Sequence, residues 1–80
     1  MTKFVFDGTA FEHYCQWALQ DVKTFNKIRD LLKDIKRNPF KGIGNPEPLK
    51  HHQKGSWSRR IDKKNRLINK VTSNEIHIAS

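Results

Sequence analysis

The chain has 80 residues, of which 35% are hydrophobic, and its 16 Lys and Arg outnumber its 8 Asp and Glu to give a formal net charge of +8. This length and composition fit one small domain near the lower limit for a self-sufficient core, which a partner or dimerisation would stabilise further. The sequence has no run that could span a membrane, no signal-peptide pattern and no second cysteine to pair with Cys15. It therefore argues against a membrane protein or a disulfide scaffold and predicts a protein of the reducing cytosol.

The N-terminal part predicts a strand followed by a helix. Residues 3–6, KFVF, alternate weakly and are rich in strand-forming residues. From Ala10 onward, apolar residues recur at helical spacing, which predicts an inward stripe of Phe11, Tyr14, Cys15, Ala18 and Leu19. Trp17 falls outside this stripe, and we expect it to be partly buried in the core, although it would also fit the rim of a partner surface.

A second helix is predicted from Asp21 to about Arg37. We expect its inward residues to be Phe25, Ile28, Leu32 and Ile35, and its solvent-facing residues to include Lys23, Lys27, Lys33, Asp34 and Lys36. Only Gln20-Asp21 separates the two helices, which predicts a tight antiparallel hairpin. Asn38-Pro39 then ends the second helix, because the residue before a proline disfavours helical geometry.

The C-terminal part predicts a sheet. A rigid loop, PFKGIGNPEP, leads to Leu49-Lys50, where we expect the sheet region to begin. Three further strands are predicted at 57–61, 66–71 and 75–79, and turn-forming residues separate them. The order βααββββ predicts an α+β domain in which a two-helix hairpin packs on a twisted, mainly antiparallel sheet.

The segment from Asn45 to Arg66 concentrates positive charge around one rigid carboxylate. It holds seven Lys and Arg against two acids, Glu47 and Asp62. Glu47 lies between Pro46 and Pro48, so its backbone is nearly rigid. A basic surface of this kind attracts phosphate polymers or an acidic protein, although high charge also serves solubility alone.

This combination fits the cleavage of RNA without a metal. RNA supplies its own nucleophile, the 2′-hydroxyl. A nuclease that uses it needs a base near that hydroxyl, cations around the phosphorane and an acid for the departing 5′ oxygen. Glu47 is the candidate base, and the arginines of the following strands are the candidate cations.

Strand alternation sorts these arginines onto two faces. In WSRRI, Arg59 shares a face with Trp57 and Ile61, and Arg60 points to the opposite face. Arg66, at the start of the next strand, would join Arg60 there. We therefore expect Arg60 and Arg66 to lie on one face, with Arg59 and Trp57 as further candidates for RNA contact.

The same residues also fit interpretations without catalysis. Glu47 would then form an ordinary ion pair, the arginines would form a solvated strand face, and Trp57 would belong to the core or stack on a base. Lys50 fits a phosphate contact, a second base or a surface lysine, and His77 fits a proton donor or an exposed strand histidine. We expect no metal, since the side chains of His51-His52 would point to opposite faces of a strand, and no other cofactor.

The run RNPFKGIGNPEPLKHHQKGSWSRRIDKKNRLI resembles the YoeB/Txe toxins of the RelE-like ribonuclease superfamily, and the similarity extends from the first strand through Ala79. PEPLK, WSRRI and NRL at this spacing are much more specific than any single residue type. The resemblance implies a RelE-like fold and a toxin of a type II toxin–antitoxin pair, which enters the ribosomal A site and cleaves messenger RNA there. By position, Glu47 would be the general base, Arg66 would stabilise the phosphate in the transition state, and Lys50 and Arg60 would bind RNA.

The resemblance also implies partners and shows two departures. The antitoxin would be YefM-like, of the Phd family, with an acidic disordered segment that wraps the basic toxin. Relatives normally end in a His-Tyr pair whose histidine is the expected general acid, whereas this sequence stops at Ser80, and Asn69 stands where relatives usually carry an aromatic residue. Without that acid we expect cleavage to fall by about 100- to 10,000-fold, with folding and antitoxin binding retained. The alternative is a non-catalytic basic module that binds RNA or an acidic protein.

Overall fold

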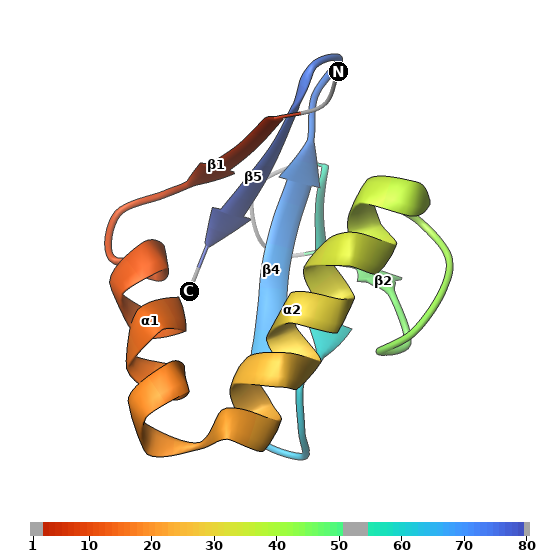
Figure 1. The fold of residues 1–80 in the computed structure, drawn as a ribbon. Coiled ribbons are helices and arrows are strands. Elements are labelled where there is room, and N and C mark those ends of the chain that lie inside the picture. Colours follow the sequence, from red (N-terminus) through yellow and green to blue (C-terminus); the bar gives the residue numbers. More distant parts are fainter. Residues whose placement is uncertain (1–2, 51–54, 80) are drawn as a thin grey trace.

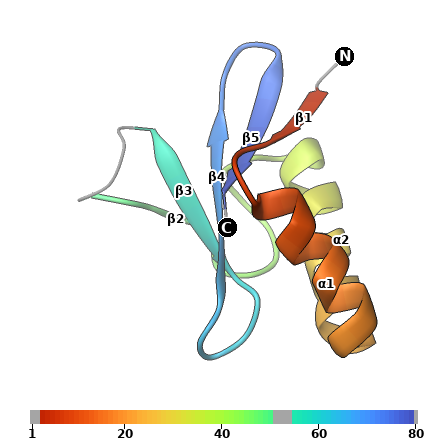
Figure 2. The same ribbon diagram turned by 90° about the vertical axis from the view of Figure 1, so that its left-hand side faces the viewer.

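Two helices cover one face of a five-stranded sheet in the computed structural model, which describes residues 3–50 and 55–79 (Figures 1 and 2). The predicted α+β class, with a two-helix hairpin on a mainly antiparallel sheet, is confirmed. The elements in chain order are β1 (Lys3–Phe6), α1 (Ala10–Gln20), α2 (Val22–Arg37), β2 (Glu47–Pro48), β3 (Ser56–Arg60), β4 (Arg66–Val71) and β5 (Glu75–Ala79).

The strands lie in the order β1-β5-β4-β3-β2, so the first and last strands of the chain are neighbours. β1 runs parallel to β5, which requires a long connection between them, and the chain between them includes both helices. The other three strand pairs are antiparallel. β2 forms the edge beside β3 and has only two residues, which limits its pairing with other chains.

β1, β4 and β5 have the predicted bounds, whereas the edge of the sheet differs. The predicted start of the sheet region at Leu49-Lys50 is wrong, because β2 pairs Glu47 and Pro48 with β3. Pro48 has no N–H to donate, and an edge strand tolerates this because one of its sides has no neighbouring strand. β3 spans Ser56–Arg60, one residue earlier than the predicted 57–61.

The predicted inward stripe of α1 is wrong. Of its five residues only Tyr14 is partly buried, and Leu19 is 90% exposed. The buried side of α1 instead carries Ala10, Tyr14 and Trp17, and the partial burial expected for Trp17 is confirmed. Apolar residues lie on both sides of α1, so contacts with other elements decide its orientation, such as the stacking of Tyr14 on Phe25 of α2 at 4.7 Å between ring centroids.

α2 follows its prediction more closely. Asp21 caps the helix by accepting hydrogen bonds from the backbone N–H groups of Lys23 at 3.1 Å and Thr24 at 3.3 Å. Phe25 is only partly buried, and the prediction missed Leu31, which has no exposed surface. The buried residues of α2 are Ile28, Leu31, Leu32 and Ile35.

The core lies between α2 and the neighbouring strands β4 and β5. Its buried residues are Ile28, Leu31, Leu32, Ile35, Leu67, Ile76 and Ile78. β3 and β2 extend away from the helices, as the edge-on view shows (Figure 2). We call the sheet face that the helices do not cover the open face. None of the helices in residues 3–50 and 55–79 is long and apolar enough to cross a membrane.

Candidate active site

Strand register places Glu47, Arg60 and Arg66 on the open face. Glu47 lies opposite Ser58, and Arg60 lies directly opposite Arg66. Side chains alternate along a strand, and residues directly opposite each other share a face. All three residues therefore point away from the face of Leu67, which is buried beneath the helices. The structure has Arg60 and Arg66 on one face, as strand alternation predicts.

Glu47 lies diagonally from Arg60 across the β2–β3 pair. Residues in this relation have their α-carbons roughly 7–8 Å apart, so both side chains can reach one group bound between them. Glu47 is exposed, and its Oε1 accepts a hydrogen bond from Nδ2 of Asn45 at 3.0 Å. None of the salt bridges within residues 3–50 and 55–79 involves Glu47. The carboxylate is therefore open to a ligand.

The turn between β3 and β4 holds Arg60 against Arg66. Asp62 Oδ1 accepts hydrogen bonds from the N–H groups of Lys64 at 2.8 Å and Asn65 at 2.7 Å. The side-chain amide of Asn65 also donates to Asp62 and holds the pKa of that carboxyl below its usual value. Like charges directly opposite each other on a sheet repel. Two arginines fixed in this way favour an anion such as phosphate beside them.

Strand register does not place Lys50 or Trp57 beside Glu47 on the open face. Lys50 is exposed and lies beyond β2, outside any strand. Trp57 is opposite Asn69, on the face away from Glu47, and is half-buried with its ring centroid 5.0 Å from that of Phe40. Trp57 is therefore neither a member of the core cluster nor a neighbour of the candidate base on the open face.

The prediction that Arg59 contacts RNA is wrong, because its side chain is fully buried at 0% exposure. Its position on the inner face agrees with strand alternation. One guanidinium nitrogen donates to the carboxylate of Asp34 at 2.5 Å. The remaining hydrogen bonds go to the backbone carbonyl oxygens of Asn38 at 2.7 Å, Lys41 at 3.1 Å and Ile43 at 3.2 Å.

The prediction that Asp34 faces solvent is also wrong. Its side chain is only 10% exposed. Hydrogen bonds from Arg37, at 2.7 Å, and from Arg59 lower its pKa to about 2. Asp34 Oδ2 also accepts the N–H of Ile43 at 2.9 Å. This carboxylate connects α2, β3 and the segment that follows α2.

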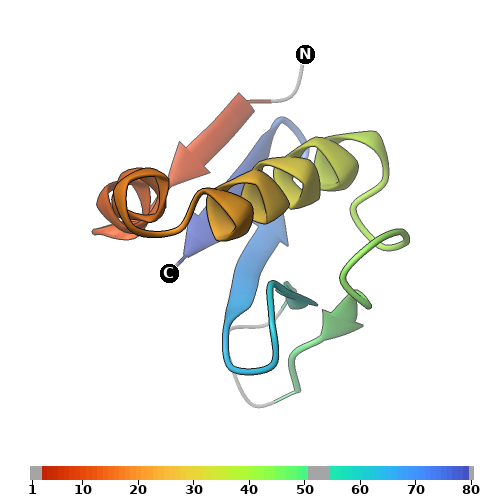
Figure 3. The same cartoon turned by 60° about the horizontal axis from the view of Figure 1, so that its bottom comes forward.

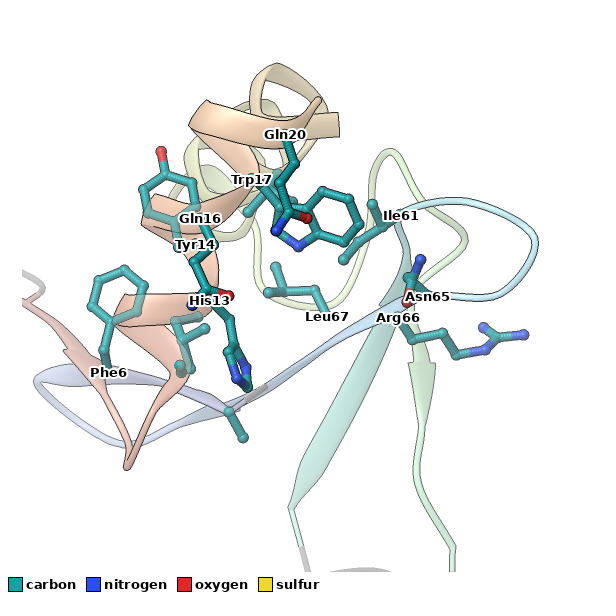
Figure 4. A pocket seen from close by; sticks show the side chains of 14 residues that line it. Phe6, His13, Tyr14, Gln16, Trp17, Gln20, Ile61, Asn65, Arg66 and Leu67 are labelled. Carbon is teal, nitrogen blue, oxygen red and sulfur yellow. The ribbon is translucent and has the colours of Figure 1, made fainter. Parts of the chain in front are cut away.

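A cavity of about 260 Å³ opens between α1 and the strands β4 and β5 (Figure 4). Tyr14, Trp17 and Leu67 contribute to its apolar lining, and His13 and Arg66 belong to its polar part. Arg66 extends away from the Trp17 ring, as Figure 4 shows. The predicted stripe of α1 omits Trp17, so the sequence prediction did not include this cavity.

His77 lies on the open face but far from Glu47 along the sheet. It is in β5, and β4 and β3 separate that strand from β2. Its Nε2 is 3.1 Å from Glu75 and its Nδ1 is 3.4 Å from Asp7, and these carboxylates raise its pKa. Among the described residues no group of three or more His, Cys, Asp or Glu forms a possible metal site. His51-His52 lies outside the described residues.

Comparisons with known sequences identify the family. A family profile described as "YoeB-like toxin of bacterial type II toxin-antitoxin system" matches residues 6–80. Toxin YoeB of Escherichia coli (strain K12) is 41% identical over 78 residues, which cover 98% of this chain and 93% of that protein. Toxin YoeB of Streptomyces coelicolor is 45% identical over 76 residues, which cover 95% of this chain and 90% of that protein.

Solved structures agree with these sequence matches. The YoeB dimer from Staphylococcus aureus superposes with a TM-score of 0.91 at 44% identity, covering 99% of this chain and 92% of that chain. The toxin in a heterotetrameric YoeB-YefM toxin–antitoxin complex from the same organism gives a TM-score of 0.89 at 43% identity, covering 100% and 93%. YafQ from E. coli, at 21% identity and a TM-score of 0.74, shares the fold alone.

Proposed function

The chain belongs to the YoeB-like toxins of bacterial type II toxin–antitoxin systems, and from this membership we propose that it is an endoribonuclease that cleaves messenger RNA in the ribosomal A site. The observation that carries the proposal is the register of β2, β3 and β4. This register gathers Glu47, Arg60 and Arg66 on the open face. A carboxylate beside two opposed arginines supplies a base and a phosphate-binding group within reach of one nucleotide.

In the proposed reaction Glu47 takes the proton of a ribose 2′-hydroxyl. The 2′ oxygen attacks the adjacent phosphorus, and a 2′,3′-cyclic phosphate forms as the bond to the 5′ oxygen breaks. Arg66 stabilises the charge that develops on the phosphate oxygens, while Arg60 and Lys50 hold the RNA strand. The leaving 5′ oxygen takes a proton from a general acid.

The register of β5 favours a general acid that follows this strand in the chain. β5 runs antiparallel to β4, and Ala79 lies opposite Ile68, two residues from Arg66 on that strand. A chain that continued in this register would pass beside Arg66. The histidine of a His-Tyr ending, which the resemblance implies, would thus come to the phosphate-binding side of the site.

The proposed partners follow from the relatives. We propose a YefM-like antitoxin of the Phd family, since a YoeB-YefM complex and a YoeB dimer are among the structures that this chain matches. An acidic antitoxin segment would bind the chain, whose net charge is +8, through electrostatic attraction. The same relatives support a homodimer in the absence of antitoxin, and the proposed substrate adds the ribosome and its messenger RNA.

The decisive test is Glu47→Gln in a translation reaction, with Glu75→Gln as the matched control. Both substitutions exchange a carboxylate for an amide of the same shape. Glu75 is in β5, where its carboxylate contacts His77. We expect Glu47→Gln to reduce cleavage by about 100- to 10,000-fold with ribosome binding unchanged, and Glu75→Gln to keep full cleavage. Cleavage that survives Glu47→Gln would refute Glu47 as the base.

A second measurement tests the general acid. The 80-residue polypeptide and the same polypeptide with a His-Tyr ending would be compared in single-turnover cleavage on ribosomes. We expect the extended polypeptide to cleave about 100- to 10,000-fold faster. Equal rates would refute an acid in that position. If neither polypeptide cleaved RNA while both bound ribosomes or an acidic antitoxin, the chain would instead be a non-catalytic binding module.

A further inference from the structure

Arg59 anchors a segment that has no helix or strand of its own. Residues 38–46 lead from the end of α2 back to β2, as the view from below shows (Figure 3). Three backbone carbonyl groups of this segment, those of Asn38, Lys41 and Ile43, accept hydrogen bonds from the buried guanidinium. Nη1 of Arg59 donates to Ile43, and Nη2 donates to Asn38 and Lys41. These three hydrogen bonds replace the backbone ladder that a strand would provide.

The backbone of this segment is unusual and closely packed. Gly42 and Gly44 have φ angles of +127° and +79°, which residues with a side chain rarely adopt. A Cβ on Gly44 would lie 2.7 Å from Cδ2 of Leu31 in α2 and 3.2 Å from Cβ of Arg59. The segment is therefore seated directly between α2 and β3, where Arg59 and Asp34 meet.

The anchored segment leads directly to the candidate base. The carbonyl oxygen of Gly44 accepts a hydrogen bond from the N–H of Arg60 at 2.6 Å. Three residues further along, Glu47 pairs with Ser58 of the same strand. A displacement of Gly44 would thus move the start of β2, and with it the Glu47 carboxylate, relative to Arg60.

We propose that Arg59 is a positioning residue, which together with Asp34 fixes residues 38–46 and so sets the place of the Glu47 carboxylate relative to Arg60 and Arg66. The proposal rests on the proposed function of Glu47 as the base. Arg59 acts on the inner face of β3 without touching RNA, since its side chain is fully buried. A displacement of about 1 Å in a catalytic group reduces a rate by about 100-fold, so anchoring of this kind matters to catalysis.

Three variants separate positioning from general stability. Arg59→Lys keeps the charge but replaces a planar fork with a single nitrogen, which cannot serve Asp34 and three carbonyls together. Asp34→Asn keeps the shape of the acceptor and removes its charge, which provides a milder change if Arg59→Lys does not fold. Ile76→Ala is the matched control, because Ile76 is 1% exposed in β5, a strand that β4 separates from β3.

Hydrogen exchange tests the anchoring without any need for cleavage. The two reporters are the N–H of Ile43, bonded to Asp34, and the N–H of Arg60, bonded to Gly44. In Arg59→Lys and Asp34→Asn we expect both to exchange at least 10-fold faster relative to the amides of β4 and β5. In Ile76→Ala we expect no such selective change. Protection that stays at the level of the unsubstituted protein would overturn the proposal.

Cleavage kinetics test the consequence at temperatures where every variant is folded. We expect kcat to fall about 10- to 100-fold in Arg59→Lys and Asp34→Asn with KM for programmed ribosomes unchanged. Ile76→Ala should keep the kcat of the unsubstituted protein. Faster exchange with an undiminished kcat would overturn the positioning role of Arg59 and leave Glu47 as the base. Absence of cleavage by the unsubstituted protein, with or without a His-Tyr ending, would instead overturn the proposed function.

Discussion

Leu31 and Leu19 are both leucines on helices, yet the structure predicts opposite outcomes for their replacement by alanine. Leu31 has no exposed surface and belongs to the core between α2 and the sheet. Leu31→Ala removes about three buried carbon groups at about 0.8 kcal/mol each and leaves a cavity, so we expect a loss of about 3–4 kcal/mol. Leu19 is 90% exposed, so Leu19→Ala should change stability by less than about 0.5 kcal/mol.

The loss at Leu31 is large for a domain of this size. An 80-residue domain has a free energy of unfolding of about 4–12 kcal/mol, and each kcal/mol corresponds to about 4–8 °C in Tm. Leu31→Ala should therefore lower Tm by about 12–30 °C, while Leu19→Ala should leave it nearly unchanged. Thermal unfolding followed by circular dichroism and urea titration would measure both. A comparable loss in the two variants would refute the orientation of α1 described above.

Two further predictions concern the segment that leads to Glu47. Gly44→Ala should lower the free energy of unfolding by about 2–4 kcal/mol, because backbone strain at φ +79° adds to a 2.7 Å clash with Leu31. Gly8 has φ +53° and open space around it, so Gly8→Ala should lower it by about 1 kcal/mol. Urea titration measures both. The pKa of Asp34 is about 2 instead of 3.8, so its ionised form contributes on the order of 2 kcal/mol to the free energy of unfolding. This contribution is complete above about pH 5 and is lost as the pH falls through about 2. Asp34→Asn should lower stability at pH 7 and reduce the change in the urea midpoint between pH 5 and pH 2. Asp30, in an exposed pair with Arg29, provides the control, and Asp30→Asn should have neither effect.

Strand positions were predictable from the sequence because one face of the sheet is buried. Alternation in β5 sets Ile76 and Ile78 inward, and both are buried, while His77 faces the other way. Helical spacing is less decisive for α1, where one apolar stripe runs from Tyr14 to Ala18 and Leu19 and another runs from Ala10 through Tyr14 to Trp17. Helical spacing cannot choose between two apolar stripes, because the choice depends on which stripe meets Phe25 and the sheet.

In the candidate site, too, some residues were predictable from the sequence and others were not. Alternation alone separates Arg60 from Arg59, and the hairpin turn alone sets Arg60 opposite Arg66. The burial of Arg59 and its partner could not be predicted from these local patterns. Asp34 sits among lysines on α2, and only the tertiary fold shows that a buried guanidinium 25 residues away removes it from solvent.

That pair explains how so small a domain holds an irregular segment in place. Residues 38–46 have no strand ladder, and the buried apolar cluster comes from α2, β4 and β5 alone. A buried ion pair is a weak source of stability, since the cost of desolvation offsets most of its attraction. Its hydrogen bonds nevertheless require their partners to lie at specific positions. Arg59 satisfies three carbonyl groups and one carboxylate at once, so only one path of the segment fits it. Two consecutive residues of β3 therefore have different roles. Arg59, on the inner face, fixes residues 38–46, which lead to Glu47, and Arg60, on the open face, faces the proposed RNA.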